Sequence, residues 1–435
     1  MRGRLSSWGR LRSQEHDLVI LREAVSAPAA LGASTLPGIA FGNGRSYGDQ
    51  ALNDGGTVWL SRGLNKFIAF DAETGVLRCE AGASLQDIIA VALPRGWFLP
   101  VSPGTQFATL GGAVANDVHG KNHHRAGTLG EHVLGLTLVR TDGRVIHCGP
   151  ELERDWFCAT IAGMGLTGLI LDVTLQLRPV AGPWIETETR TFETLNEFFE
   201  LCEATTEVWE YSVAWVDCMH SGSGRTRGAL FCGNHAWSTE PFAPPRVRSV
   251  AALPPLRWVT PTVTRAFNEL YFRRAAARTG RSRQSYLSFF YPLDGVLAWN
   301  RIYGPRGFYQ FQCVVPRAGE RDAIDALLRE VAASASGSFL SVLKTFGPRP
   351  ALGMLSFPME GTTLALDFPN GGERTTRLFA RLNAIVVAAG GRLYPAKDAT
   401  MSASMFRRGH PRLAEFLPFR DPGISSEMSR RLLGD

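Results

Sequence analysis

The stretch Gly42-Asn43-Gly44-Arg45-Ser46-Tyr47-Gly48-Asp49-Gln50 (GNGRSYGDQ) follows a short apolar run and decides the fold. A Rossmann turn needs glycines spaced G-x-G-x-x-G at the start of an apolar helix. Here a tyrosine takes the third position, the glycine comes one residue later, and polar residues follow. A Walker loop is excluded too, because no Gly-Lys-Ser/Thr closes the run. The stretch fits an anion-binding nest of backbone N–H groups and an ordinary glycine turn equally well.

Two further stretches carry glycine through otherwise apolar sequence. Residues 103–120 read PGTQFATLGGAVANDVHG, and residues 162–170 read AGMGLTGLI. Small residues placed in this way let a flat or extended ligand lie directly against the backbone. Three such stretches are more than turns alone require, so we expect a ligand-binding domain.

The composition is that of a globular protein. The chain has 435 residues, 45% of them hydrophobic, and a formal net charge of +6, which favours two or three domains. Its longest apolar runs stop well short of the roughly 20 residues that span a bilayer. The basic start has no apolar stretch behind it, so we expect no secretory signal. Seven scattered cysteines without a CxxC pair indicate reduced thiols in a cytoplasm rather than disulfides or a zinc site.

The texture of the sequence changes near residue 183. Before it, short strand-like runs follow one another through tight turns such as 72–75, and the clearest helical pattern begins with a capping box at Ser84 and Asp87. After it, longer helical patterns alternate with strands, and a last helix is predicted after Ser425. This arrangement predicts an α+β fold rather than a doubly wound sheet. The predicted helices of the second part are 196–206, 321–334 and 375–389, and its predicted strands are 212–216, 307–315 and 362–368.

The three glycine-rich stretches together resemble the FAD domain of the vanillyl-alcohol oxidase and p-cresol methylhydroxylase (PCMH) superfamily. More narrowly, the chain is similar to the decaprenylphosphoryl-β-D-ribose 2-oxidase family over nearly its whole length. The resemblance implies a PCMH-type FAD-binding domain of two subdomains (1–182), an α+β substrate domain with an antiparallel sheet (183–391), and a C-terminal segment (392–435) that returns to the FAD domain. Matching blocks include Trp8-Gly9-Arg10, Trp299-Asn300-Arg301, Phe346-Gly347-Pro348-Arg349, Asp367-Phe368-Pro369 and the run from Gly391 to Asp398.

The resemblance implies that these stretches bind FAD. Residues 40–50 would wrap the pyrophosphate, Ile170 would contact the adenine half, and Tyr394 would approach the flavin. Many relatives attach FAD through a histidine in the opening loop, at the position where this chain has Arg45, so we expect a non-covalent cofactor. The other expected FAD contacts are Ala40, Phe41, Gly42, Asn43, Gly44, Ser46, Tyr47, Gly48, Asp49, Gln50, Gly104, Thr109, Leu110, Gly111, Gly112, Asn116, Asp117, Val118 and His119.

Three residues are the expected catalytic groups. Oxidising a secondary alcohol with a flavin transfers a hydride and a proton and leaves negative charge on the reduced ring. A lysine can stabilise that charge or accept the proton, and Lys397 matches the family's lysine in this role. A surface lysine paired with Asp398 is the alternative. His119 matches a histidine beside the flavin, and Tyr47 matches a tyrosine at the sugar end.

A metal site is the other interpretation of residues 117–124. Asp117, His119, His123 and His124 could converge on one ion. The glycines around them favour a winding loop over a rigid set of ligands, so we expect no metal and interpret His123 and His124 as hydrogen-bonded loop residues.

The predicted strand 307–315 indicates a sugar site. Period-two alternation places Gln310 and Gln312 on one face, where solvent exposure or a bound ligand would satisfy them. The resemblance favours recognition of hydroxyl groups. It also places Lys344, which shares a strand face with Phe346, near a substrate phosphate, where a cation is chemically sensible.

The sugar pocket departs from the family at three positions. Thr363 and Ala365 stand where the family has asparagine and cysteine, and Phe290, followed by Tyr291, stands where it has a tyrosine. We therefore expect the redox step to be kept while the sugar or its lipid differs. The expected substrate contacts are Lys121, Phe290, Tyr291, Gln310, Gln312, Lys344, Phe346, Thr363 and Ala365.

A basic stretch mixed with aromatic residues lies between 257 and 283. A solvated loop is the simplest interpretation, but such a mixture also suits the headgroup region of an anionic membrane. No recognition module accompanies it, so we expect no nucleic-acid binding. Its arginines are 257, 265, 273, 274, 278, 281 and 283.

The resemblance implies a cytoplasmic FAD enzyme, peripheral at the inner face of the plasma membrane. It would oxidise a secondary hydroxyl of a polyprenyl-phosphate-linked, ribose-like pentose to a 2-keto sugar for cell wall polysaccharide biosynthesis. An NADH-dependent short-chain reductase would then reduce the ketone and complete an epimerisation. The alternatives are an oxidase of a free alditol or aldonolactone and a catalytically inactive flavin-binding scaffold.

Overall fold

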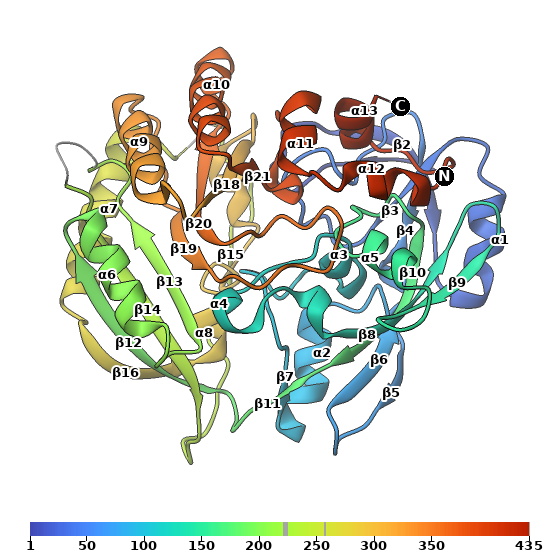
Figure 1. The fold of residues 1–435 in the computed structure, drawn as a ribbon, viewed down its shortest axis with the longest axis horizontal. Coiled ribbons are helices and arrows are strands. Elements are labelled where there is room, and N and C mark those ends of the chain that lie inside the picture. Colours follow the sequence, from blue (N-terminus) through green and yellow to red (C-terminus); the bar gives the residue numbers. More distant parts are fainter. Residues whose placement is uncertain (221–224, 256–257, 435) are drawn as a thin grey trace.

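One large antiparallel sheet and two smaller sheets organise the two halves of the molecule (Figure 1). The computed structural model describes residues 1–220, 225–255 and 258–434. Mixed helix and antiparallel sheet confirm the predicted α+β class.

The opening loop, residues 42–50, extends from a four-stranded mixed sheet formed by the first part of the chain. In the order β1-β2-β4-β3, both neighbours of β4 run parallel to it, and β1 is antiparallel to β2. Residues 42–50 follow β3 directly, as the sequence predicts. The strands are β1 (Arg2–Leu5), β2 (Gln14–Ile20), β3 (Gly38–Phe41) and β4 (Thr57–Leu60), and the first helix is α1 (Ala27–Gly32).

The rest of the glycine-rich half contains a five-stranded antiparallel sheet in the order β5-β6-β10-β8-β9. The predicted capping box is confirmed: Ser84 Oγ accepts from Asp87 N, and Asp87 Oδ2 accepts from Ser84 N. The strands are β5 (Phe67–Phe70), β6 (Val76–Glu80), β8 (Val133–Val139), β9 (Val145–Cys148) and β10 (Leu169–Gln176), the short pair is β7 (Trp97–Phe98) with β11 (Arg178–Pro179), and the helices are α2 (Leu85–Ala92), α3 (Leu110–Ala115), α4 (His123–Ala126) and α5 (Arg154–Thr160).

The other half is built on an eight-stranded sheet in the order β16-β12-β14-β13-β19-β20-β18-β21. The six helices and strands predicted for this part are confirmed to within two residues. The strands are β12 (Trp184–Phe192), β13 (Tyr211–Val216), β14 (Gly228–Ala236), β16 (Gly280–Ser285), β18 (Phe308–Pro316), β19 (Ser341–Phe346), β20 (Gly361–Pro369) and β21 (Arg392–Leu393); the helices are α6 (Leu195–Thr205), α7 (Pro261–Ala276), α8 (Tyr286–Phe290), α9 (Glu320–Ala333) and α10 (Glu373–Ala388), and β15 (Arg248–Ser249) pairs with β17 (Val296–Leu297).

Helices α9 and α10 cover one face of β18 and β20, as Figure 1 shows. Phe311 and Phe368 pack on that side against Phe379 of α10. The alternate residues Gln310 and Gln312 therefore face away from these helices, toward the glycine-rich half. This is how the sheet presents polar side chains to the other half of the molecule.

The end of the chain crosses between the halves. Strand β21 joins the large sheet beside β18, and the helices after it lie beside the N-terminal strands, where Figure 1 also places both termini. Gly38 at the start of β3 is bonded through its N–H to Gly423 O and through its carbonyl to Ser425 N. The last helix confirms the one predicted after Ser425. These helices are α11 (Ala403–Gly409), α12 (Leu413–Phe416) and α13 (Glu427–Leu433).

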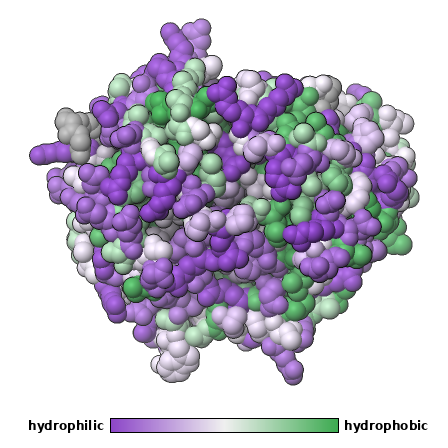
Figure 2. Space-filling view, in the orientation of Figure 1, coloured by the Kyte–Doolittle hydropathy of each residue, from purple (hydrophilic) through white to green (hydrophobic). Residues whose placement is uncertain are grey.

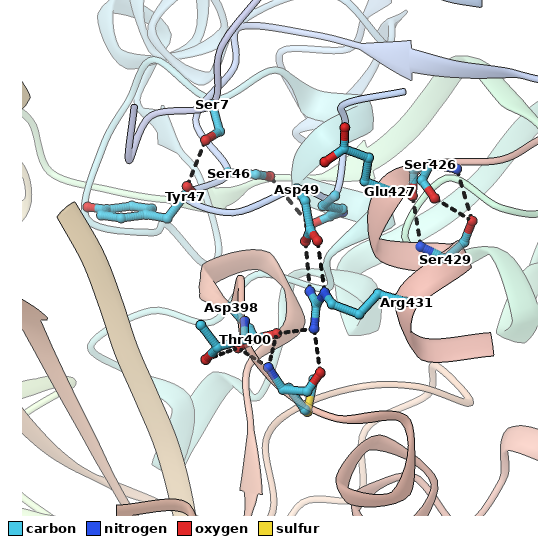
Figure 3. Close-up of polar contacts among 12 residues, drawn as sticks. Ser7, Ser46, Tyr47, Asp49, Asp398, Thr400, Ser426, Glu427, Ser429 and Arg431 are labelled. Atoms are coloured by element: carbon cyan, nitrogen blue, oxygen red, sulfur yellow. Dashed lines mark hydrogen bonds and ion pairs between the residues drawn. The ribbon is translucent and has the colours of Figure 1, made fainter. Parts of the chain in front are cut away.

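Arg431 of α13 joins the opening loop to the segment that carries Lys397 (Figure 3). Its Nε and Nη2 donate to the two carboxylate oxygens of Asp49 at 2.8 and 2.7 Å, and its Nη1 donates to Asp398 at 2.9 Å. Only 6% of the Asp398 side chain is exposed. Because one guanidinium neutralises two largely buried carboxylates, this contact clamps two loops that are far apart in the sequence.

The free thiols predicted from the scattered cysteines are present. All seven cysteines are buried free thiols. Hydrophilic residues cover much of the face in Figure 2. Within the described ranges, no helix combines the length and apolar character needed to cross a membrane.

Replacing Arg431 by methionine tests the clamp. Two buried carboxylates would lose their cation, and breaking a buried pair in this way costs about 3–5 kcal/mol. We expect a clear fall in the urea midpoint of the glycine-rich half, followed by tryptophan fluorescence. The control is Arg377→Met, which removes an exposed ion pair with Glu373 on α10 and should leave the midpoint nearly unchanged. Equal effects of the two substitutions would contradict the clamp.

Candidate active site

A cavity of about 430 Å³ lies between the glycine-rich loops and the inner face of the large sheet. Its walls come from residues 39–51, from the loop and helix around α3, from residues 164–170, from strands β18 to β20, and from the segment after β21. The three glycine-rich stretches thus meet at one site. A site of this size and shape suits a small-molecule ligand or cofactor.

Close backbone approach explains two of the glycines in the opening loop. A Cβ at Gly42 would lie 2.4 Å from Thr109 Oγ1, and a Cβ at Gly48 would lie 1.6 Å from the carbonyl oxygen of Asp398. Asn43 Nδ2 further ties the loop to Phe107 O at 2.8 Å. The loop is therefore packed tightly against both neighbouring segments, which leaves no room for side chains at these glycines.

Backbone strain and unsatisfied polar atoms gather at the same walls. Asp117, Ala162 and Met164 all have φ between 41° and 61°, a region that residues other than glycine rarely adopt. Arg45 Nε and Asn116 Oδ1 are buried without a hydrogen-bond partner in the described part of the chain. Strain and orphaned polar atoms of this kind concentrate where a ligand completes the structure.

Lysine is almost confined to this cavity. Of the 46 lysines and arginines in the chain, only four are lysines, and three of them (Lys121, Lys344 and Lys397) line the cavity. The fourth, Lys66, forms an exposed ion pair with Glu23. A buried lysine can lose its proton near neutral pH, whereas arginine stays charged. The cavity therefore concentrates the cations whose charge can change.

Each of the three amines has a distinct partner. Lys397 Nζ lies 3.9 Å from the centre of the Tyr47 ring, and Lys344 Nζ donates to His119 Nδ1 at 3.0 Å. Lys121 donates to the carbonyl oxygen of Phe289 and lies over that residue's ring. Burial lowers the pKa of Lys397 to about 8 and that of Lys121 to about 7. Burial and the charges of the other two lysines lower the pKa of Lys344 to about 7.

His119 stands at the centre of these contacts. Burial, together with Lys344, holds its pKa well below the usual range, so the imidazole is neutral. The Gln312 amide nitrogen lies 3.0 Å from His119 Nε2, and the rings of Phe346 and Tyr394 pack around the imidazole. A neutral imidazole has one acceptor nitrogen, and here Nδ1 accepts from Lys344. It can therefore orient the Lys344 ammonium without adding charge.

Most residues singled out from the sequence line the cavity. From the expected FAD set these are Ala40, Gly42, Asn43, Gly44, Arg45, Ser46, Tyr47, Gln50, Gly104, Thr109, Gly111, Gly112, Asn116, Val118, His119, Ile170 and Tyr394; from the expected substrate set, Lys121, Phe290, Gln310, Gln312, Lys344, Thr363 and Ala365; Lys397 also lines it. The roles assigned to them stay predictions.

Seven residues from the same sets lie behind the walls instead. Asp117 is fully buried and accepts bonds from Ser356 Oγ and Gly130 N. Tyr291 is bonded to Ser102 Oγ, and Phe346 supports the His119 ring. These residues shape the site rather than form its surface. The seven are Phe41, Gly48, Asp49, Leu110, Asp117, Tyr291 and Phe346.

The prediction that His123 and His124 are hydrogen-bonded loop residues is correct only for the hydrogen bond of His124, because both residues lie in the short helix α4. His124 Nε2 lies 3.2 Å from Trp209 O, as expected of a hydrogen-bonded residue. His123 is buried with neither ring nitrogen bonded in the described part of the chain, and it packs 4.3 Å from the Phe346 ring centre. The hydrogen bond predicted for His123 is therefore wrong, because aromatic packing holds the ring. Among the described residues, no group of three or more metal-ligating side chains could hold an ion.

Sequence reasoning missed several residues at the site. Asp367 continues the period-two face of Thr363 and Ala365 on β20, and that alternation could have revealed it. Asp294 accepts from Thr105 Oγ1 and from Gln106 N, and no local pattern marks it. The aromatic wall formed by Trp8, Trp215 and Trp299 comes from three distant segments, so it could not be seen in the sequence.

The residues present fit a flavin. The glycine-lined wall leaves room for a flat group. A bound cofactor could supply hydrogen-bond partners for the buried Arg45 Nε and Asn116 Oδ1. The buried lysine amines favour a negatively charged group beside them. The family model "FAD binding domain" matches residues 22–149, which include the opening loop and α3. FAD is therefore the cofactor, and the protein is an FAD-dependent oxidoreductase.

Known proteins match the chain at two levels. Decaprenylphosphoryl-beta-D-ribose oxidase of Mycolicibacterium smegmatis is 35% identical over 99% of this chain and 97% of its own length. An uncharacterized protein of Streptomyces coelicolor is 33% identical over 80% of this chain and 99% of its own length. L-gulonolactone oxidase of Mus musculus is 32% identical, but over only 32% of this chain and 31% of its own. The similarity to the first protein spans both halves of the structure, and the chain belongs to the decaprenylphosphoryl-β-D-ribose oxidase family of FAD enzymes.

Proposed function

We propose that this enzyme oxidises the C2 hydroxyl of a polyprenyl-phosphate-linked, ribose-like pentose to a ketone. The observation that carries this proposal is the convergence of three buried lysines, two glutamines and a neutral histidine on one cavity that also touches the opening loop. The lysines favour an anionic substrate, and the carboxamides suit sugar hydroxyls. The substrate named for the Mycolicibacterium smegmatis relative has both features.

Lys397 and Tyr47 would act at the redox end. FAD, when bound, accepts the hydrogen and the electron pair from the carbinol carbon. Lys397, as a buried amine beside Tyr47, would either stabilise the charge that develops there or take up the hydroxyl proton. The burial that lowers its pKa to about 8 keeps both forms accessible near neutral pH. Tyr47, with a pKa raised well above its usual value by burial, stays neutral and can only donate or accept a hydrogen bond.

Lys344 and Lys121 would bind the phosphate. Lys344 Nζ is hydrogen-bonded to His119 and to Gly120 O. The positive charge of Lys121 helps to lower the pKa of Lys344. A phosphate between the two amines would restore the positive charge on both, because an anion favours the protonated form. Gln310 and Gln312 lie along the strand between this end and Tyr47, where the sugar would fit.

The changes at Thr363, Ala365 and Phe290 bear on which pentose is preferred. All three line the cavity, and Thr363 and Ala365 lie next to Gln312 across the strand pair β18 and β20. They replace polar or reactive side chains of the family while the residues around Lys397 are kept. We propose that the redox chemistry is retained and that the choice of sugar or prenyl group is altered.

The two smaller sheets would form the two subdomains of a PCMH-type FAD domain. The four-stranded sheet carries the opening loop, and the five-stranded sheet carries Ile170 on β10. A cofactor lying between them would touch both, which is the arrangement that the superfamily resemblance implies. The division at 182 and 391 stays a prediction.

Contact with a membrane surface is part of the proposal, at the cytoplasmic face. Helix α7 exposes apolar side chains and buries polar ones. Thr264 and Asn268 are buried, whereas Val263 and Leu270 are more than half exposed. Arg265, Arg274 and Arg278 have no carboxylate partner among the described residues, while Arg273, Arg281 and Arg283 are paired and Arg257 lies outside the described ranges. Exposed apolar groups beside unpaired arginines suit an anionic lipid surface.

Tyr271 of the same helix lines the cavity. A lipid-linked sugar held at the exposed side of α7 would therefore lie on a helix that also borders the cavity. A separate NADH-dependent short-chain reductase would complete the epimerisation by reducing the ketone.

Anaerobic mixing with a panel of polyprenyl-phosphate sugars tests the reaction. We expect a ribose-like member to bleach the flavin absorbance, and the released ketone to be reduced by an added NADH-dependent reductase. Lys397→Met should keep the yellow, FAD-bound protein but slow bleaching by at least about 100-fold, the range of one positioned acid, base or charge.

The outcomes separate the alternatives. Faster bleaching by a free alditol or aldonolactone would favour a soluble-sugar oxidase. A flavin that stays oxidised with every member would favour a scaffold. Unchanged bleaching by Lys397→Met would remove this lysine from the mechanism.

Acid precipitation tests how FAD is held. A guanidinium keeps its proton and cannot replace the histidine that bonds to the flavin in relatives. The Arg45 guanidinium is instead packed 4.2 Å from the Trp8 ring centre and 4.9 Å from that of Phe107. We expect all flavin absorbance in the supernatant after precipitation. A yellow pellet would show covalent attachment.

Vesicle sedimentation tests the membrane surface. We expect binding to vesicles rich in anionic lipid, weakened by salt, and lost in the double variant Val263→Glu, Leu270→Glu. Leu152→Glu is a matched control, because Leu152 is a leucine exposed to 58% outside α7. Equal binding by the double variant and the control would contradict a role for α7.

A further inference from the structure

Asp367 is a buried carboxylate placed directly behind the cavity wall. It lies on β20 opposite Gln310 of β18, with no exposed surface. Gln310 Nε2 donates to Asp367 Oδ1 at 2.6 Å, and the Ser338 hydroxyl accepts from Asp367 N at 3.0 Å. The second carboxylate oxygen lacks a donor at bonding distance in the described part of the chain, although the Tyr303 hydroxyl lies near it. Asp367 is thus a fully buried carboxylate directly behind the cavity wall, the kind of group that often serves a site rather than packing alone.

Gln310 connects this carboxylate to the redox end of the site. Its amide nitrogen donates to Asp367, and the same side chain interacts with Tyr47, whose pKa it lowers. The amide orientation, and so the direction of the Tyr47 O–H, follows from the position of Asp367. A protonated or amidated residue 367 would remove that control.

The charges around Lys397 lead to the same residue. The ionisable groups that act on it are Tyr47 from the opening loop, His119 after α3, Lys344 from β19 and Asp367 from β20. Tyr47 and His119 are neutral, and Lys344 can only be neutral or positive. Asp367 alone among these four is a source of negative charge, and it opposes the effect of burial on Lys397.

We propose that Asp367 is a positioning residue: it orients Gln310 and Tyr47, and its carboxylate supplies the negative charge that keeps Lys397 protonated. This inference rests on the role proposed for Lys397. Asp367, which does not line the cavity, would thus control the protonation of the Lys397 amine.

The low number of lysines makes the test direct. Protein as purified, labelled at the lysine ε-carbon, should give four side-chain NMR signals, one for each lysine. The Lys397 signal is identified by its loss in Lys397→Arg. Its titration midpoint should fall by about one pH unit or more in Asp367→Asn, which keeps the shape but removes the charge. An unchanged midpoint would overturn the proposal.

A matched control separates this effect from the loss of any buried carboxylate. Glu320 is also buried and accepts from Thr362 Oγ1 at 2.6 Å, at the opposite end of β20 from Asp367. Glu320→Gln should leave the Lys397 midpoint in place. An equal shift in both variants would show a general loss of structure and count against a specific role for Asp367.

The unsubstituted protein provides a second measurement if Asp367→Asn does not fold. Burial raises the pKa of Asp367 to about 7. Because the two groups are coupled, the Lys397 signal should show a smaller inflection near that pH as the carboxyl takes up its proton. A single-step curve would contradict the coupling.

The pH profile of flavin bleaching then links the inference to catalysis. Whether Lys397 acts as a cation or as a base, the limb of the profile that reports it should move to lower pH in Asp367→Asn. If no sugar bleaches the flavin, the proposed reaction fails while the NMR result still decides the role of Asp367. If bleaching occurs and the limb does not move, Asp367 does not act through Lys397.

Discussion

The Arg431 guanidinium bonds to two carboxylates that lie next to Tyr47 and Lys397 in the sequence: Asp49 is two residues beyond Tyr47, and Asp398 follows Lys397 directly. Tyr47 N also donates to Ala396 O, and Gly48 leaves room for the carbonyl of Asp398. The contact between the Lys397 amine and the Tyr47 ring is thus fixed by the clamp behind it. Without a shared cation, the two acidic residues would repel each other and separate the loops that carry the site.

The sequence predicted local features well and distant contacts poorly. The capping box at Ser84, the helix after Ser425 and the alternation that turns Gln310 and Gln312 toward one side all follow from patterns of a few residues, and the structure confirms them. The glycines of the opening loop predicted close backbone approach for the same reason. Glycine spacing alone did not identify the ligand, so predicting an FAD-binding cavity also required the family resemblance.

What the sequence could not reveal depends on tertiary packing. Arg431 and Asp49 are 382 positions apart, and an arginine near the end of a basic helix has no local sign of a buried partner. Aromatic packing overrode the hydrogen bond expected for His123. Asp367 is a different case: it continues a visible alternation on β20, but its buried position behind Gln310 is apparent only once β18 and β20 are paired.

The choice between lysine and arginine separates two kinds of positive charge in this protein. Arginine serves the structural contacts, such as the clamp and the stacking of Arg45 between Trp8 and Phe107. Its charge is permanent, so the cation in these contacts is kept at any pH near neutrality. Lysine is kept for the cavity, where burial and neighbouring charges bring its pKa values to about 7 or 8. The site can therefore respond to the charge of whatever enters it.

The crossing of the chain after β21 also determines when the site can form during synthesis. The opening loop and strand β18, which carries Gln310 and Gln312, are synthesised before Tyr394, Lys397 and Arg431. An incomplete chain would have the walls of the cavity but not the amine at its redox end or the clamp that positions it. The complete cavity therefore forms only after the last residues of the chain have been made, because Tyr394 and Lys397 line it and Arg431 holds two of its loops.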